Sequence, residues 1–98
     1  MNLVKDYYIV VAEVKDPERP THWDRTILDG KLCVFLHEII TGEHFFFCVN
    51  YGTEDYPDWH TVTTTRVQSF NVDGDGEKVN SVTVETKNTI YHFTRLEI

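Results

Sequence analysis

The sequence is short of cysteine and of long apolar runs, and each shortage excludes a class of protein. Its 98 residues contain only Cys33 and Cys48, too few for the disulfide framework of a small secreted domain. We therefore expect free thiols in a reducing cytoplasm. No stretch approaches the ~20 apolar residues that a membrane-spanning helix needs, so we expect no membrane partner.

Basic residues are also scarce. Nine lysines and arginines stand against sixteen aspartates and glutamates, which leaves a net charge of −7. That charge disfavours binding to the phosphate backbone of nucleic acid or to an anionic membrane. It favours a protein partner with a basic surface.

The motifs of common enzymes and cofactor sites are missing as well. The chain has no G-x-S-x-G, no H-E-x-x-H, no phosphate-cradling glycine loop and no dinucleotide fingerprint. Ser69 and Ser81 are its only serines, and neither follows a strained turn typical of a nucleophile. We therefore expect a protein that is not an enzyme and has no cofactor.

What the chain has is β-forming sequence. Hydrophobic residues make up 41% of it and aromatic residues 13%, enough for one core in a single β domain spanning residues 1–98. No helical period is visible. The runs expected to be strands are Tyr7–Val14, Thr21–Leu28, Lys31–Ile39, Glu43–Tyr51, Thr61–Val72, Val79–Thr86 and Thr89–Ile98. About seven strands in up-and-down order predict an all-β fold, either a small antiparallel barrel or a strongly curled meander.

Two tight turns follow from short polar dipeptides. Asp29-Gly30 suits the positive φ angles of a hairpin turn, which predicts that the second and third runs pair antiparallel. Lys87-Asn88 predicts a last hairpin in which Val82 lies opposite Phe93 and Val84 lies opposite Tyr91. The other face of this last hairpin is polar, so one side packs and the other meets water.

The central hairpin, from Lys31 to Tyr51, is apolar on both faces. With the three-residue loop Ile40-Thr41-Gly42, Ile39 lies near Glu43; a two-residue Thr41-Gly42 turn is the alternative register. In the first register one face holds Leu32, Val34, Leu36, Phe46 and Cys48, and the other holds Cys33, Phe35, Ile39, Phe45, Phe47 and Val49.

Two apolar faces need two covering layers. Either loops cover the second face of the central hairpin, or that hairpin forms the interface of a homo-oligomer, to which we assign Phe35, Phe45 and Phe47.

The segment G-T-E-D-Y-P-D-W-H is the loop most typical of a binding site. It places Glu54, Asp55 and Asp58 beside Tyr56 and Trp59. Tyrosine and tryptophan are enriched at interface hot spots, and carboxylates steer a loop toward a basic surface. The alternative is that Tyr56 and Trp59 only cap a barrel.

A second candidate site is basic. Arg66, Lys87, Asn88 and Arg95 would line a pocket for a phosphorylated small molecule, because arginine binds phosphate bidentately. The alternative is that these are ordinary solvated strand residues.

Two patterns suggest metal sites, and neither is complete. Asn71, Asp73, Asp75 and Gly76 match the opening of a calcium loop, but its twelfth position is Val82, so we expect an ordinary turn.

The second pattern is His37, Glu38 and His44 at one end of the central hairpin. In the bulged register His37 points away from the other two, which leaves a cross-strand pair of His44 with Glu38. We therefore predict no metal site.

The C-terminal third contains W-H-T-V-T-T-T-R-V, a Gly-Asp turn and V-T-V-E-T-K-N-T-I-Y-H-F. It resembles the endings of many short phage or mobile-element proteins, which pair a Thr/Ser-Val strand with a T-x-N-[ST]-x-Y hairpin. The resemblance implies a viral or mobile-element product acting in the cytoplasm of a bacterial host, against a defence system.

The leading hypothesis is thus a non-enzymatic binding protein, a phage-encoded antagonist of a bacterial defence protein acting through an acidic, aromatic surface. The alternatives are an oligomeric sponge for a small nucleotide signal and a structural or assembly component of a virion.

Overall fold

The computed structural model describes residues 3–16, 18, 25–75 and 78–96. Its elements, in chain order, are the 3-10 helix η1 (Leu3–Lys5), β1 (Tyr7–Val14), the 3-10 helix η2 (Arg25–Leu28), β2 (Lys31–Phe35), β3 (His44–Asn50), β4 (Trp59–Arg66), β5 (Ser69–Asp75), β6 (Lys78–Glu85) and β7 (Thr89–Arg95). Within the described residues no helix is long and apolar enough to cross a bilayer.

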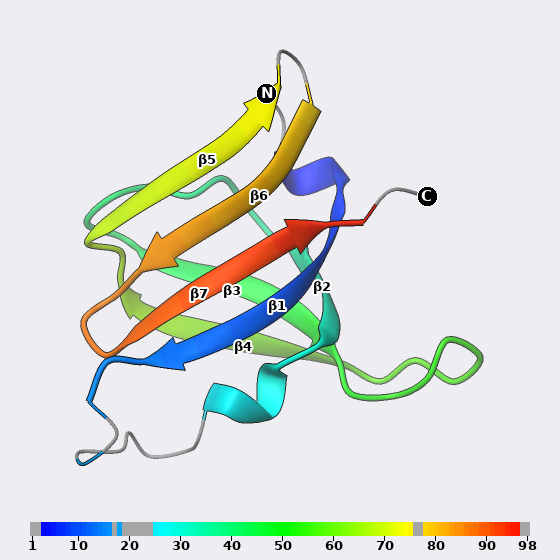
Figure 1. Cartoon of the computed structure of the whole chain (residues 1–98). Helices are drawn as coiled ribbons and strands as arrows, with labels where there is room; N and C mark the ends of the chain where they lie inside the picture. Colours follow the sequence, from blue (N-terminus) through cyan, green and yellow to red (C-terminus); the bar gives the residue numbers. More distant parts are fainter. Residues whose placement is uncertain (1–2, 17, 19–24, 76–77, 97–98) are drawn as a thin grey trace.

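All seven strands belong to one antiparallel sheet in the order β4-β3-β2-β1-β7-β6-β5 (Figure 1). The all-β class and the number of strands are therefore confirmed. Strands adjacent in the chain are also adjacent in the sheet, except that β4 and β5 are its two edges and β1 pairs with β7. The sheet is not closed into a barrel, because β4 and β5 do not pair with each other.

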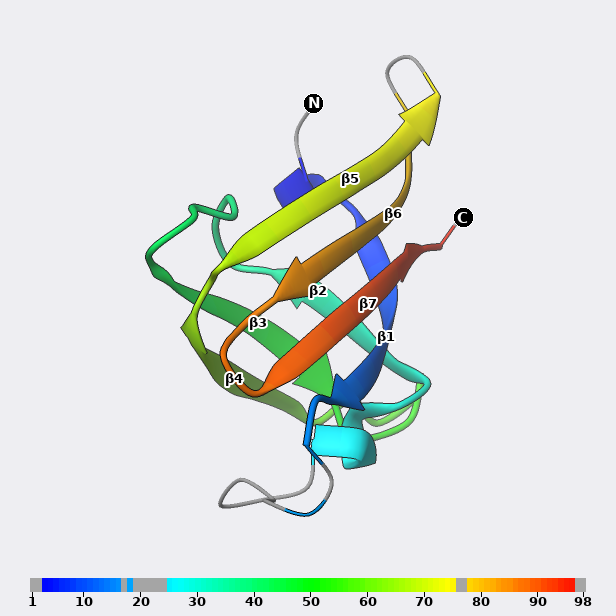
Figure 2. The same cartoon turned by 60° about the vertical axis from the view of Figure 1, so that its left-hand side comes forward.

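The core lies on the concave face of this bent sheet (Figure 2). Along β1 the side chains alternate, with Tyr8, Val10 and Ala12 buried while Tyr7 and Val11 point outward and are exposed. Aromatic rings fill the centre of this core. The ring of Tyr8 stacks on Phe35 at 4.3 Å between centroids, and Phe93 meets Phe35 edge-on at 4.8 Å.

The bulged register of the central hairpin is confirmed. Cys33 lies opposite Val49 and Phe35 opposite Phe47, the same register that puts Ile39 beside Glu43. The ladder is shorter than predicted, because β2 ends at Phe35 and residues 36–43 form a loop. The ladder ends there because the Nε2 atom of the His37 ring accepts the backbone N–H of Phe46, at 3.1 Å.

The last hairpin also has the predicted register. Val82 lies opposite Phe93, and Val84 lies opposite Tyr91. These four side chains are fully or almost fully buried, whereas Thr94 on the other face is exposed. One side of the hairpin packs on the core, as the alternation in the sequence predicts.

The interface assigned to three phenylalanines is wrong. Phe35, Phe45 and Phe47 are 2%, 0% and 0% exposed, because they point into the concave core of their own chain. The second apolar face of the hairpin is the convex one. There Leu36 and Phe46 are 49% and 38% exposed, so this chain alone leaves that face half bare.

The strand expected at Thr21–Leu28 is also wrong. Its last four residues form η2, and residues 21–24 lie outside the described part of the chain. Gly30 has the positive φ of +81°, yet β2 pairs with β1. Two hydrogen bonds explain this: the Asp29 carboxylate accepts the Ala12 N–H at 2.7 Å, and the Gly30 N–H donates to the Val10 carbonyl at 2.8 Å.

The run Thr61–Val72 contains two strands, β4 and β5, and not one. The break lies at Val67-Gln68, where the Val67 N–H donates to the Glu43 carbonyl and the Gln68 N–H donates to the Glu85 carbonyl. The first bond fixes Val67 to the loop before β3, and the second fixes Gln68 to the end of β6. At this point the chain therefore passes from one edge of the sheet to the other. The sequence contains no glycine or proline there, so nothing in its pattern marks the break.

Burial of ionisable groups predicts that alkaline pH destabilises the fold. Burial, followed by the negative charge of Asp6, raises the pKa of Tyr8 to about 12, and burial raises the pKa of the Cys33 thiol. The unfolded chain releases these protons at lower pH, so stability is full below the ordinary values and falls as pH rises through them. We expect the free energy of unfolding in urea to be about 4 kcal/mol lower at pH 11 than at pH 8, with about 1 kcal/mol of the difference from Tyr8 and the rest from Cys33.

The variant Tyr8→Phe provides the control. It loses the hydrogen bond from the Tyr8 hydroxyl to the Leu3 carbonyl, 3.0 Å long, so it is less stable at both pH values. Because it has no phenol to ionise, its stability falls less between them. An unchanged dependence on pH in this variant would contradict the assignment to Tyr8.

Candidate functional site

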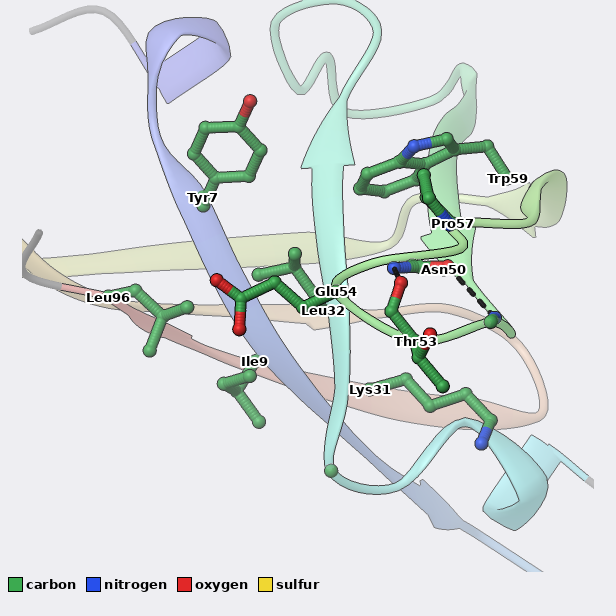
Figure 3. Close-up of a pocket in the computed structure, with 12 residues that line it drawn as sticks. Tyr7, Ile9, Lys31, Leu32, Asn50, Thr53, Glu54, Pro57, Trp59 and Leu96 are labelled. Carbon is green, nitrogen blue, oxygen red and sulfur yellow. Dashed lines mark hydrogen bonds between the residues drawn. The ribbon is translucent and has the colours of Figure 1, made fainter.

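A groove of about 880 Å³ lies on the convex face of the sheet, beside the loop of residues 51–58 (Figure 3). Its lining comes from three places: the outer faces of β1 and β2, the loop with the adjoining ends of β3 and β4, and the residue after β7. The lining residues are Tyr7, Ile9, Gly30, Lys31, Leu32, Asn50, Gly52, Thr53, Glu54, Pro57, Trp59 and Leu96.

The floor of the groove is apolar because of the strand register. Ile9 on β1 lies opposite Leu32 on β2, and both point away from the concave core. Tyr7 and Leu96 flank them and are 41% and 36% exposed. Their neighbours Tyr8 and Val10 are fully buried, so these strands are apolar on both sides and the outer set is left without cover.

The side chain of Asn50 organises the wall of the groove. Its Oδ1 accepts the N–H of Gly52 at 2.9 Å and the N–H of Asp58 at 2.8 Å. The Tyr51 N–H donates to the Asp58 carbonyl, and the Thr53 N–H donates to the Tyr56 carbonyl. The loop therefore has a defined shape although all its residues after Tyr51 are exposed.

Gly52 is needed for this compact shape. A Cβ atom at this position would collide with the carbonyl oxygen of Tyr56 and lie 2.7 Å from the nitrogen of Asp58. Both obstacles are backbone atoms, which a side-chain movement cannot relieve. Asn50 and Gly52 together thus hold the two ends of the loop against each other.

Charge lies along the rim. Glu54 lines the groove, and the carboxylates of Asp55 and Asp58 are exposed on the same loop. Asp58 pairs with His60 at 3.1 Å. Lys31 reaches from β2 toward the base of the loop, with its ammonium 5.6 Å from the centre of the Tyr51 ring. Carboxylates therefore predominate on the side formed by the loop.

The structure brings together part of the predicted acidic and aromatic site. Glu54 and Trp59 line the groove, and Trp59 is 42% exposed. Tyr56 is 83% exposed at the tip of the loop, and Asp55 and Asp58 are exposed beside it. The alternative in which Tyr56 and Trp59 cap the core is wrong, because both lie outside the concave face.

Other parts of the groove were not predicted from the sequence. Tyr7, Ile9 and Leu32 were recognised as strand residues only, since their role depends on which strands become neighbours. Asn50 and Gly52 had a readable signal. Asparagine two residues before glycine favours a turn in which the side-chain oxygen accepts the later backbone N–H.

The second predicted site, for a phosphorylated ligand, is only partly brought together: the Lys87 N–H donates to the Thr65 hydroxyl beside Arg66 at 3.3 Å. Arg95 ends β7, whereas Lys87 and Asn88 precede its start, and Arg95 pairs with Asp6 at 3.3 Å. Arg66 donates to the carbonyl of Gly42 at 2.9 Å. Arg95 is therefore separated from the other three residues, none of the four lines the groove, and a shared phosphate site stays a prediction.

The candidate metal ligands also lie apart. Of the described residues, no group of three or more histidine, cysteine, aspartate or glutamate side chains is arranged to hold a metal. Asn71, Asp73 and Asp75 lie along β5, and Gly76 is outside the described part of the chain. The His44 ring bonds the Thr64 carbonyl on β4 at 2.8 Å, so it is turned away from the predicted partner Glu38.

The ionisable groups with clearly shifted pKa values lie away from the groove. They are Tyr8, Cys33 and Tyr91, and burial in the core raises the pKa of each. Their exposed fractions are 0%, 0% and 1%. A solute in the groove cannot reach them, so their shifts reflect core packing and not a reactive site.

No protein family model, curated protein or solved structure matches this chain.

Replacing Asn50 tests how the loop is held. Asn50→Ala removes the acceptor for two backbone N–H groups, so we expect amide exchange at Gly52 and Asp58 to accelerate by about tenfold or more, which corresponds to a loss of about 1.4 kcal/mol. Amide exchange followed by NMR gives the measurement.

Asn50→Asp is the matched control, because its carboxylate retains the acceptor oxygen. It should preserve most of the protection at both amides. Equal exchange in the alanine and aspartate variants would show that the loop is held by other contacts.

Proposed function

We propose that this chain is a non-enzymatic binding protein whose convex groove takes a short, extended segment of a partner protein with basic and apolar side chains. The observation that carries the proposal is the groove itself: an apolar floor left uncovered by the fold, beside a shaped loop rich in carboxylates and aromatic rings. Such a surface is costly to expose to water unless another molecule covers it.

The floor of the groove supports an apolar contact. Tyr7, Trp59 and Leu96 are each between 36% and 42% exposed, and they surround the more buried Ile9 and Leu32. Aromatic anchors with a half-buried ring lose little side-chain freedom on binding, which is why they recur as hot spots. The fixed shape of the loop lowers the ordering cost further.

The charge of the rim supports a basic partner. Glu54, Asp55 and Asp58 are exposed on one side of the groove, and the whole chain carries a net charge of −7. Their field accelerates association with a cationic segment and opposes an anionic one. The same field disfavours binding between two copies of the chain through this rim.

The narrower hypothesis concerns the identity of the partner. The resemblance of residues 59–93 to the endings of phage proteins supports a bacterial defence protein as the target and the bacterial cytoplasm as the place of action. The nucleotide-sponge alternative receives less support, since Lys87 and Arg95 lie at opposite ends of β7. A homo-oligomer or virion lattice would use the convex face, where Leu36 and Phe46 remain exposed.

Selection from a displayed library of random peptides tests the groove. We expect the wild-type chain to enrich peptides with several lysines or arginines among apolar residues. Reversal of two rim charges, Glu54→Lys with Asp55→Lys, should weaken their binding by about tenfold or more, and 0.5 M salt should do the same. Binding is measured by calorimetry.

The matched control reverses two exposed carboxylates that belong to neither the groove nor β5, Asp16→Lys with Glu43→Lys. It changes the net charge by the same amount, yet groove-binding peptides should keep their affinity. If both double variants weaken every selected peptide equally, only the net charge matters and the groove is not the site.

Trp59 tests the apolar part of the groove. Trp59→Ala should weaken a selected peptide by about 2 kcal/mol, the loss typical of an interface hot spot. Because the ring is 42% exposed, unfolding in urea should change by no more than about 1 kcal/mol.

Phe46→Ala serves as the control for Trp59→Ala, since Phe46 is 38% exposed on β3 and does not line the groove. It should leave binding in the groove unchanged. An equal loss in both variants would contradict the assignment of Trp59.

A further inference from the structure

The two edges of the sheet form an open seam. β4 and β5 follow each other in the chain, but within the part of the chain that the structure describes they do not pair with each other, and each has one strand neighbour. They meet at Val67-Gln68 and diverge from that corner (Figures 1 and 2). An up-and-down sheet of this order would become a closed barrel only if the seam were filled.

The corner end of the seam is already closed. Val67 is 2% exposed, its carbonyl accepts the Gly42 N–H at 2.8 Å, and its N–H donates to the Glu43 carbonyl at 2.9 Å. The loop of residues 36–43 therefore occupies the corner. Beyond the corner, β5 is paired on one side only, with β6.

β5 leaves apolar side chains bare on the inner side of the sheet. Phe70 lies opposite Val84 and Val72 lies opposite Val82, so both point toward the concave face. Their partners on β6 are fully buried, yet Phe70 itself is 40% exposed and Val72 only partly buried. An added strand would cover Phe70 and pair the free backbone groups of β5 together.

The outer side of β5 indicates the charge of such a strand. Asp73 and Asp75 alternate with Val72 and Gly74, and both carboxylates are exposed. A neighbouring strand with lysine or arginine on its outer side and apolar residues on its inner side matches both faces of β5. A second copy of this chain would bring its own Asp73 and Asp75 and its net charge of −7 to the same edge.

We propose that β5 is a second docking site, which binds an extended segment of a partner protein that alternates basic and apolar residues and adds to the sheet as an eighth strand. The site is separate from the convex groove. It uses backbone pairing along β5 for affinity and Phe70, Asp73 and Asp75 for selectivity.

A defined peptide tests this proposal on the whole chain. The probe is the acetylated and amidated heptapeptide K-V-K-V-K-V-K. In NMR-detected amide exchange, a free peptide concentration ten times its Kd should slow exchange in β5 by about tenfold, because pairing protects these amides. The experiment is repeated with the double variant Glu54→Lys and Asp55→Lys, which weakens binding in the groove, and the protection of β5 should persist.

Three variants locate the contact. Phe70→Thr and the double variant Asp73→Lys with Asp75→Lys should each raise the Kd by about tenfold or more. Phe46→Thr, which removes an equally exposed ring from the convex face, should leave the Kd unchanged, as should Glu54→Lys with Asp55→Lys. These last two variants distinguish failure of this site from failure of the groove.

Two control peptides and the oligomeric state complete the test. A probe methylated at every backbone nitrogen, and the acidic peptide E-V-E-V-E-V-E, should both fail to protect β5. The proposal is overturned if the methylated probe protects equally, if the peptide protects the groove instead, or if no protection appears at millimolar peptide. Sedimentation showing that the free chain dimerises through β5 would also overturn it, because the edge would then belong to a second copy.

Discussion

The pairing of β1 with β7 is the constraint on which the rest of the structure depends. It joins the N-terminal strands to the C-terminal hairpin in one sheet and brings Tyr8 against Phe93 and Phe35. With those rings packed on the concave side, the sheet bends around a single core. The concave side of the central strands is therefore buried in the core. Their convex side is left partly exposed.

The exposed convex side forms the floor of the candidate site. Strands β1 and β2 are apolar on both sides, but the described part of the chain covers only their concave side. Asn50 and Gly52 shape a loop beside the uncovered side, and the result is a groove with an apolar floor and an acidic rim. The site therefore arises from a surplus of apolar residues as much as from the loop.

Sequence reasoning succeeded where the determinants were local. The two hairpins with short loops, around Ile40-Thr41-Gly42 and Lys87-Asn88, have the predicted registers, because loop length and alternation specify register. It failed where the competing partners lay far apart in the chain. Residues 25–28 became a 3-10 helix, and Thr61–Val72 was divided between the two edges of the sheet.

The sequence by itself determined the all-β class, the acidic charge and the fact that the central hairpin has two apolar faces. The tertiary structure decided which of these faces is buried, because that depends on the side toward which the sheet bends. It placed Phe35, Phe45 and Phe47 inside and Val34, Leu36 and Phe46 outside. It also brought Arg95 to Asp6 and Arg66 to the Gly42 carbonyl, contacts that depend on the pairing of segments far apart in the sequence.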